Sequence, residues 1–185
     1  MELLQGKEFI GDFAKRTREN LAVYKGEYEV TQMLNSVIGI LIIPKERDWG
    51  KISDKMIPSN MLCELQMCIR KNGKKNLTDK EKKTIHLNDI IYHLRNASAH
   101  AFFAFEKEIQ NRKGEDLPIA NVIFADCNDD TVRKSARKRK NGMLTEEEAD
   151  FWIQIPVELL YKFLMEFADA VAKEYIKQGS APTDN

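Results

Sequence analysis

The sequence predicts a mainly α-helical protein of the α+β class, an up-and-down bundle of about five helices with a small antiparallel β insert before the last helix. Apolar residues recur with helical spacing in several long segments, whereas residues 102–155 show the alternation and short apolar runs typical of strands. The 185 residues, 43% hydrophobic and 31% charged, fit one folded domain. We expect that domain to span residues 1–178 and to be followed by a flexible tail, 179–185.

The first two helices are predicted from uninterrupted apolar stripes. Residues 9–24 have apolar side chains at helical spacing, and Gly26 ends this helix. The stretch 27–43 fits the i, i+3, i+4, i+7 template throughout, and Pro44 ends it.

The third helix begins at Pro58 and extends to Ile69, after which the charged stretch 71–76 is predicted to be a loop. Thr78 and Glu81 have the spacing of a capping box, which begins either the next helix or a short turn before it. In the β insert, strands are expected around 103–109, 122–125 and 151–155. Pro156 then begins the last helix.

The fourth helix carries the candidate catalytic residues. Its apolar stripe, from Leu87 to Ser98, leads into Arg95, Asn96 and His100. A permanent cation, a carboxamide and an imidazole can bind a phosphate and transfer a proton. On a straight helix Arg95 and His100 stand about 140° apart around the axis and ~7.5 Å apart along it. Either the helix loosens before His100, or two copies meet at a two-fold axis and pool these residues. The alternative interpretation is an exposed arginine and a histidine that favours the helix dipole.

A second candidate is a basic segment between two predicted strands. It is either a solvated loop or a clamp on an RNA backbone, which would make binding salt-dependent without specifying sequence. The acidic residues Glu146–Glu148 either mask it or offset its charge. His86 and His93 have no partner at a useful spacing and are interpreted as incidental. The candidate RNA-binding residues are Arg133, Lys134, Arg137, Lys138, Arg139 and Lys140.

Composition excludes several classes of protein. Basic and acidic residues cancel at 29 each, so any preference for nucleic acid must come from local charge. The longest apolar run, 37–43, is far below the ~20 residues of a membrane span, and the N-terminus does not resemble a signal peptide, so we expect a cytoplasmic protein. Three cysteines and three histidines lack metal-ligand spacing, so we expect no metal and no cofactor.

Two stretches carry a resemblance to a known family. Arg95-Asn96-x3-His100 resembles the Arg-x4-6-His signature of the HEPN superfamily, the "higher eukaryotes and prokaryotes nucleotide-binding" domains. The segments 28–36 and 39–46 resemble the second helix of the plasmid- and defence-associated branch. The order of elements is similar as well, and the resemblance covers most of the chain.

The resemblance implies a metal-independent endoribonuclease of toxin or defence type whose active site forms across a homodimer. Arg95 and His100 would be catalytic and Asn96 supporting. RNA would be cut by its own 2′-OH to give a 2′,3′-cyclic phosphate, and an antitoxin is a candidate partner. Some members carry a tyrosine two residues after the histidine that is modified with AMP, but Phe102 stands there in this chain. The alternative function is a non-catalytic module that binds nucleic acid or protein.

Overall fold

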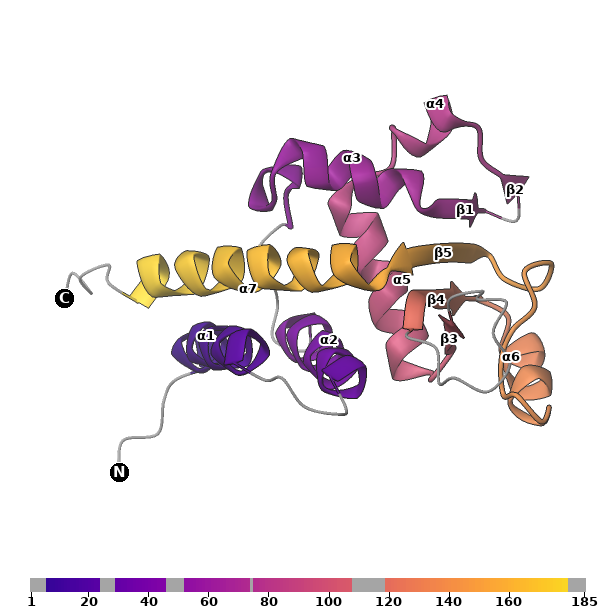
Figure 1. The fold of residues 1–185 in the computed structure, drawn as a ribbon, viewed down its shortest axis with the longest axis horizontal. Helices are drawn as coiled ribbons and strands as arrows, with labels where there is room; N and C mark the ends of the chain where they lie inside the picture. The colour runs from indigo at the N-terminus through magenta and orange to yellow at the C-terminus, as the bar shows by residue number, and fades with distance from the viewer. Residues whose placement is uncertain (1–5, 24–28, 46–51, 74, 108–118, 180–185) are drawn as a thin grey trace.

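The computed structural model describes residues 6–23, 29–45, 52–73, 75–107 and 119–179. In these ranges the chain forms seven α-helices and a single five-stranded antiparallel sheet, which lies toward one end of the molecule (Figure 1). The prediction of a five-helix bundle with a small β insert is therefore wrong. Two of the five strands precede the motif helix in the chain, so the sheet is a layer of the fold in its own right.

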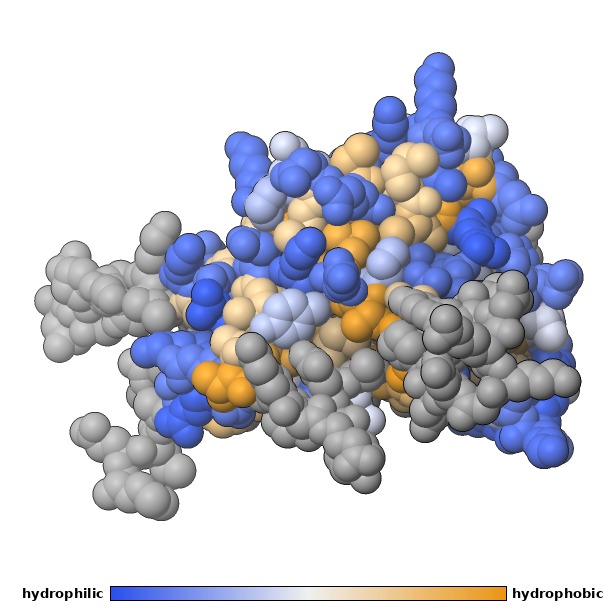
Figure 2. Space-filling view, in the orientation of Figure 1, coloured by the Kyte–Doolittle hydropathy of each residue, from blue (hydrophilic) through white to orange (hydrophobic). Residues whose placement is uncertain are grey.

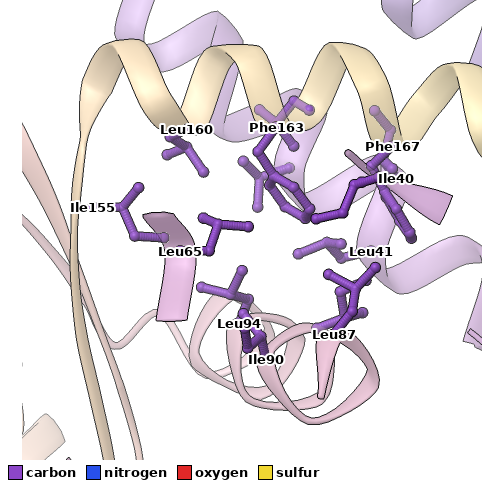
Figure 3. Packing of buried hydrophobic residues seen from close by; sticks show 14 of the residues in the cluster. Ile40, Leu41, Leu65, Leu87, Ile90, Leu94, Ile155, Leu160, Phe163 and Phe167 are labelled. Atoms are coloured by element: carbon purple, nitrogen blue, oxygen red, sulfur yellow. The ribbon is translucent and has the colours of Figure 1, made fainter. Parts of the chain in front are cut away.

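Helices form the larger part of the main core. The long C-terminal helix α7 (Val157–Gly179) packs against α1 (Gly6–Val23) and α2 (Glu29–Lys45), and α5 (Leu87–Ala99) packs against α2 and the sheet. Figure 3 shows apolar side chains of these helices and of the sheet directed toward one another. The fully buried members include Ile40, Leu41, Leu87, Ile90, Leu94, Leu160, Phe163 and Phe167.

The sheet has the strand order β2-β1-β5-β4-β3. Its strands are β1 (Ile69–Asn72), β2 (Lys75–Asn76), β3 (Phe103–Lys107), β4 (Ile119–Asp126) and β5 (Phe151–Pro156). The three predicted strands are confirmed as β3, β4 and β5. The predicted loop over 71–76 is confirmed as a turn at Gly73, but it is wrong for the strand residues 71–72 and 75–76. Lys71 faces inward, and its Nζ donates to the carbonyls of Glu146 and Glu147 at 2.6 and 2.9 Å.

Both faces of the neighbouring strands β4 and β5 are covered. Alternate residues of β4 and β5 point to opposite sides, so Val122, Phe124 and Ile153 join the main core, whereas Ala125 and Trp152 contact a second, smaller cluster. The smaller cluster lies under α6 (Asp130–Arg137). It also contains Phe102, Met143, Leu144 and Ala149.

The basic segment is a helix for most of its length, not the loop that the sequence predicted. Asp129 caps α6 by accepting from the backbone N–H groups of Thr131 and Val132. Val132 and Ala136, four residues apart, pack on the second cluster and leave the charged side chains outside. Figure 2 shows a hydrophilic surface at the end of the molecule where α6 lies.

The remaining elements are short. The helix α3 (Ser59–Met67) ends before Ile69, and η1 (Asp54–Met56) precedes it. The capping box of Thr78 and Glu81 is confirmed, and it begins the separate short helix α4 (Asp79–Lys82). In the ranges described, no helix is both long and apolar enough to cross a membrane. Of the predicted tail, residues 180–185 lie outside the described residues.

Candidate functional site

His100 lies at the end of α5, where the backbone leaves the helix. The N–H of Phe102 donates to the carbonyl of Ala97 at 2.8 Å, and the N–H of Ala101 donates to that of Ser98 at 3.2 Å. These two bonds form a Schellman motif, with Ala101 in the left-handed region at φ 58°. The regular helix therefore ends at Ala99, and His100 has the non-helical angles φ −97° and ψ 0°. The N–H of His100 still donates to the carbonyl of Asn96 at 3.0 Å, so the chain leaves the helix at His100 and Ala101 and does not loosen before His100.

The imidazole of His100 lies against α6. Nη1 of Arg133 is 3.3 Å from its Nε2, and Nη2 of Arg137 is 3.0 Å from its Nδ1. Burial lowers the pKa of His100, and the charges of Arg133 and Arg137 lower it further, while Asp126 and Asp130 act in the opposite direction. The net shift is downward, so the neutral imidazole is favoured near pH 7.

Arg95 and Asn96 belong to a neighbouring network. Nη1 of Arg95 donates to Oδ1 of Asn96 at 3.4 Å, and Nδ2 of Asn96 donates to Oδ2 of Asp126 at 3.1 Å. In the described part of the chain, the hydrogen-bonding contacts of His100 are with α6 rather than with Arg95. The two candidate catalytic groups stand five positions apart on the helix, which turns them to different sides.

Asp126 is the centre of that network. Asp126 was not among the candidate residues predicted from the sequence, although it directly follows a predicted buried strand. Its side chain is 1% exposed, and it accepts from His93, Asn96 and the backbone N–H of Cys127. Burial alone would raise the pKa of Asp126, but these hydrogen bonds outweigh burial and lower it. The carboxylate is therefore ionised at neutral pH.

His93 is a member of the site region, so its interpretation as incidental is wrong. Its Nδ1 lies 2.8 Å from Oδ2 of Asp126, and its ring stacks on Phe151 with centroids 4.2 Å apart. The carboxylate accepts from Nδ1, and this contact fixes the orientation of the ring. A sequence signal existed, because His93, Asn96 and His100 stand at i, i+3 and i+7, on one side of a helix.

The other basic residues of the segment divide into two groups. Arg139 forms an ion pair with Glu148, with Nη1 2.6 Å from Oε2, and this contact lowers the pKa of Glu148 to about 2. Glu148 thus offsets part of the basic charge, as one of the two alternatives proposed. Lys134, Lys138 and Lys140 are exposed. His86 lies apart from the site and pairs with Asp54, Nδ1 to Oδ2, at 2.8 Å.

A family comparison bears directly on this arrangement. A family model described as HEPN pEK499 p136 matches residues 1–178, almost the whole chain. The chain belongs to this HEPN family. No curated protein and no solved structure matches it. Membership supports a nucleotide-binding or ribonuclease-type domain.

The arrangement can supply both proton transfer and charge stabilisation. A neutral imidazole can accept a proton near pH 7, and guanidinium groups can bind phosphate oxygens two at a time. Among the residues that the structure describes, no group of three His, Cys, Asp or Glu side chains is placed to bind a metal ion.

Proposed function

We propose that this HEPN protein is a metal-independent endoribonuclease of toxin or defence type. The observation that carries the proposal is the environment of His100, a partly exposed imidazole with a lowered pKa that lies between two guanidinium groups. A group that is neutral at pH 7 can take a proton from a hydroxyl, and the adjacent cations favour an anionic substrate. Family membership supports the same class of chemistry.

The reaction uses a nucleophile that RNA itself carries. His100 removes the proton of a ribose 2′-OH while O2′ bonds to the adjacent phosphorus. The bond from phosphorus to O5′ breaks, and O5′ takes up a proton, which leaves a 2′,3′-cyclic phosphate and a 5′-OH. Arginine side chains, Arg95 among them, stabilise the negative charge on the five-coordinate phosphorus, and Asn96 supports Arg95. DNA lacks the 2′-OH and is not cut.

The imidazolium formed on His100 returns its proton, through water, to O5′, so the reaction balances. A second chain is the proposed source of a further cation at the reaction centre. In a homodimer joined through α5, Arg95 of one chain would complete the site of its partner, since Arg95 and His100 turn to different sides of one helix. An antitoxin that covers this cleft is the proposed inhibitor.

Cleavage of a mixed RNA pool by EDTA-treated protein tests the proposal. The wild type is expected to cut RNA, but not DNA of matching sequence, and to leave 2′,3′-cyclic phosphate ends. We expect His100→Ala to lower the rate by about 100-fold or more, because general acid–base catalysis contributes on that order. Arg95→Ala is expected to lower it by about 100-fold, the usual loss when one charge-stabilising donor is removed.

Two matched variants control this experiment. His86→Ala removes an exposed histidine outside the site, and Arg70→Ala removes an exposed arginine of β1. Both should retain the wild-type rate. Equal activity of all four variants would contradict the assignment of the site.

The exposed lysines of α6 and its C-terminal end favour a second candidate function, a module that binds nucleic acid without cutting it. Salt-sensitive RNA binding without cleavage by any variant would support that function instead.

A further inference from the structure

Both ring nitrogens of His100 face groups that can only donate hydrogen bonds. The guanidinium of Arg133 lies 3.3 Å from Nε2 and that of Arg137 lies 3.0 Å from Nδ1. A guanidinium has five N–H donors and no acceptor. A neutral imidazole has one acceptor nitrogen, so it can accept from only one of these arginines, and an imidazolium can accept from neither. In each protonation state at least one N–H group therefore faces another.

The carboxylates that act on His100 do not resolve this conflict. Asp126 already accepts from His93, Asn96 and a backbone N–H. Asp130 already accepts from Arg133, with Nε of Arg133 3.1 Å from Oδ1. The three side chains of His100, Arg133 and Arg137 thus present donors toward one another and need an acceptor from outside.

The two arginines are also positioned before any ligand binds. They stand at i and i+4, on one side of α6. Asp130 fixes Arg133 through two of its nitrogens, and the guanidinium of Arg137 lies 5.6 Å from the ring centroid of Phe102, which is fully buried. Arg137 is exposed and His100 is half-buried, so an anion in solution can reach them. Fixed donors reduce the entropy lost on binding.

We propose that His100, Arg133 and Arg137 form a binding site for a phosphate group, which enters between the imidazole and the two guanidinium groups and accepts an N–H from each. The assignment of this group as the phosphate that is cut rests on the proposed ribonuclease function, but the binding of the anion does not. Arg133 and Arg137 then belong to the reaction centre, whereas Lys134, Lys138 and Lys140 contact the RNA chain farther away.

Binding of phosphate is coupled to a proton. In the free protein, burial, Arg133 and Arg137 lower the pKa of His100 against the opposing effect of Asp126 and Asp130. A bound phosphate places negative charge beside the ring and raises that pKa, because an opposite charge favours the imidazolium. At a pH between the pKa of the free protein and the higher pKa of the complex, binding is accompanied by uptake of a proton by the ring. In the reaction, the same effect stabilises the imidazolium once the 2′-OH proton has been transferred.

Proton NMR of the histidine ring in the full chain tests this site, with inorganic phosphate as the probe. The signal of His100 is assigned by its loss in His100→Gln. We expect a saturable shift on adding phosphate and a higher pKa for His100 in its presence. Arg133→Gln and Arg137→Gln should each weaken phosphate binding by about tenfold or more, since each removes a charge-assisted hydrogen bond. Arg70→Gln, which removes an exposed arginine of β1, should change the affinity for phosphate by no more than about twofold.

The outcomes separate this inference from the proposed function. Phosphate binding that raises the His100 pKa in a protein that cuts no RNA supports the site and contradicts the ribonuclease. If the protein cuts RNA but phosphate does not shift the His100 signal, the phosphate site is contradicted and the proposed ribonuclease function is retained. Equal weakening by Arg70→Gln and the two α6 variants would mean attraction to general charge, which also overturns the site. A circular dichroism spectrum and a denaturation midpoint like those of the wild type show that the two α6 variants are folded.

Discussion

Two histidines of α5, seven residues apart, lie in opposite electrostatic environments. His93 is backed by the carboxylate of Asp126 and stacked on Phe151, whereas His100 is flanked by Arg133 and Arg137. The carboxylate fixes the orientation of His93, and the guanidinium groups favour the neutral form of His100. The helix thus carries one imidazole whose orientation is fixed, that of His93, and one that is mainly neutral near pH 7, that of His100.

The pH dependence of RNA cleavage tests the environment of His100. If the neutral imidazole is the base, kcat/KM rises with pH through the pKa of His100, which lies below 6.5. The shift comes first from burial and then from Arg133 and Arg137, with Asp126 and Asp130 opposing it. Arg137→Gln removes one cation, so the pKa and the acid limb of the profile should move to higher pH.

Arg70→Gln serves as the control for that profile. It removes an exposed arginine of β1, and its acid limb should coincide with that of the wild type. The overall rate of Arg137→Gln should also fall, but the position of the limb is the informative readout. An acid limb that Arg137→Gln leaves in place would show that this arginine does not act on the catalytic base.

Asp126 supports a prediction about stability. Its pKa in the folded protein is below the ordinary value of 3.8, so the unfolded chain binds the proton more readily. Its contribution to folding is therefore complete at neutral pH and is lost as pH falls through the folded pKa. We expect Asp126→Asn to lower the free energy of unfolding by about 1–3 kcal/mol at pH 7. The deficit relative to the wild type should shrink as the pH falls below 3.8.

Urea denaturation at several pH values measures this deficit. Asp89→Asn, at an exposed position of the same helix, is the matched control and should cost no more than about 1 kcal/mol. A deficit of Asp126→Asn that stays constant from pH 7 to pH 3 would show that the charge of Asp126 does not stabilise the fold.

Among the elements, the end of α5 positions the site. Ala101 occupies the left-handed region at φ 58°, which disfavours residues with a Cβ by about 1 kcal/mol. Ala101→Gly should relieve this strain, and after the greater entropy of glycine in the unfolded chain is counted, we expect a gain of about 0.5 kcal/mol. Ala99→Gly, in the last helical turn, should instead lose about 1 kcal/mol. Shifts of the denaturation midpoint in opposite directions, upward for Ala101→Gly and downward for Ala99→Gly, would confirm the Schellman motif. A lower midpoint in both variants would contradict it.

The exposed lysines of α6 and its C-terminal end test the second part of the basic segment. Replacing Lys134, Lys138 and Lys140 by glutamine should weaken RNA binding and flatten its salt dependence. Each phosphate contact with single-stranded RNA contributes about 0.7 to the slope of log K against log salt, so loss of all three should lower the slope by about 2. Binding is measured by fluorescence anisotropy between low and moderate salt.

A triple variant at distant sites distinguishes local contacts from overall charge. Lys80, Lys83 and Lys173 are exposed as well, and replacing them by glutamine changes the net charge by the same amount. This variant should retain the wild-type slope. Equal slopes for both triple variants would show that the lysines of the basic segment do not contact RNA.

At the same scale, the elements show what one sequence can predict. Long apolar stripes predicted α1, α2, α5 and α7, because periodicity within an element is local. The helix α6 was missed, since a short helix in which Ala136 is buried and Val132 is half-buried has almost no apolar stripe. The strand β1 was missed because an inward-facing Lys71 conceals the alternation.

The residues of the candidate site also divide into those that the sequence predicted and those that it did not. Arg95, Asn96 and His100 lie close together in the chain and could be selected from one motif. The contact of His93 with Asp126 spans 33 residues, and that of His100 with Arg133 also spans 33. Pairing over such a separation depends on the packing of α5, β4 and α6, which one sequence does not specify. The motif thus predicted the imidazole but not the residues that set its charge.

At the scale of the whole molecule, the proposed homodimer needs a surface, and α5 provides a candidate. Tyr92 is 41% exposed, and Arg95 and Ala99 follow it at i+3 and i+7 on the same side of the helix. A two-fold axis beside this stripe would bring the Arg95 side chains of both chains to one cleft. Tyr92→Glu should dissociate the dimer and abolish cleavage together, because an exposed tyrosine at the centre of an interface often dominates its affinity.

Phe9 of α1 has the same exposed fraction, 41%, and lies on another helix, so Phe9→Glu is a matched control. Sedimentation velocity measures the dimer, and the cleavage assay measures the site. A monomeric Tyr92→Glu protein that cuts RNA at the wild-type rate would contradict the shared site. Loss of the dimer in Phe9→Glu, with Tyr92→Glu unchanged, would place the interface on α1 instead.

Mixing two inactive proteins decides whether the site is shared. If Arg95 of one chain acts with His100 of the other, a mixed dimer of Arg95→Ala and His100→Ala chains has one site with both residues intact. Random exchange makes half of the dimers mixed, and each then has one of two sites, so about a quarter of the wild-type activity should return. If each chain instead completes its own site, every site in the mixture lacks one residue and no activity returns. Because the hydrogen-bond partners of His100 lie on α6 of its own chain, recovery would mean that the base and its arginine neighbours act as one unit while Arg95 comes from the partner.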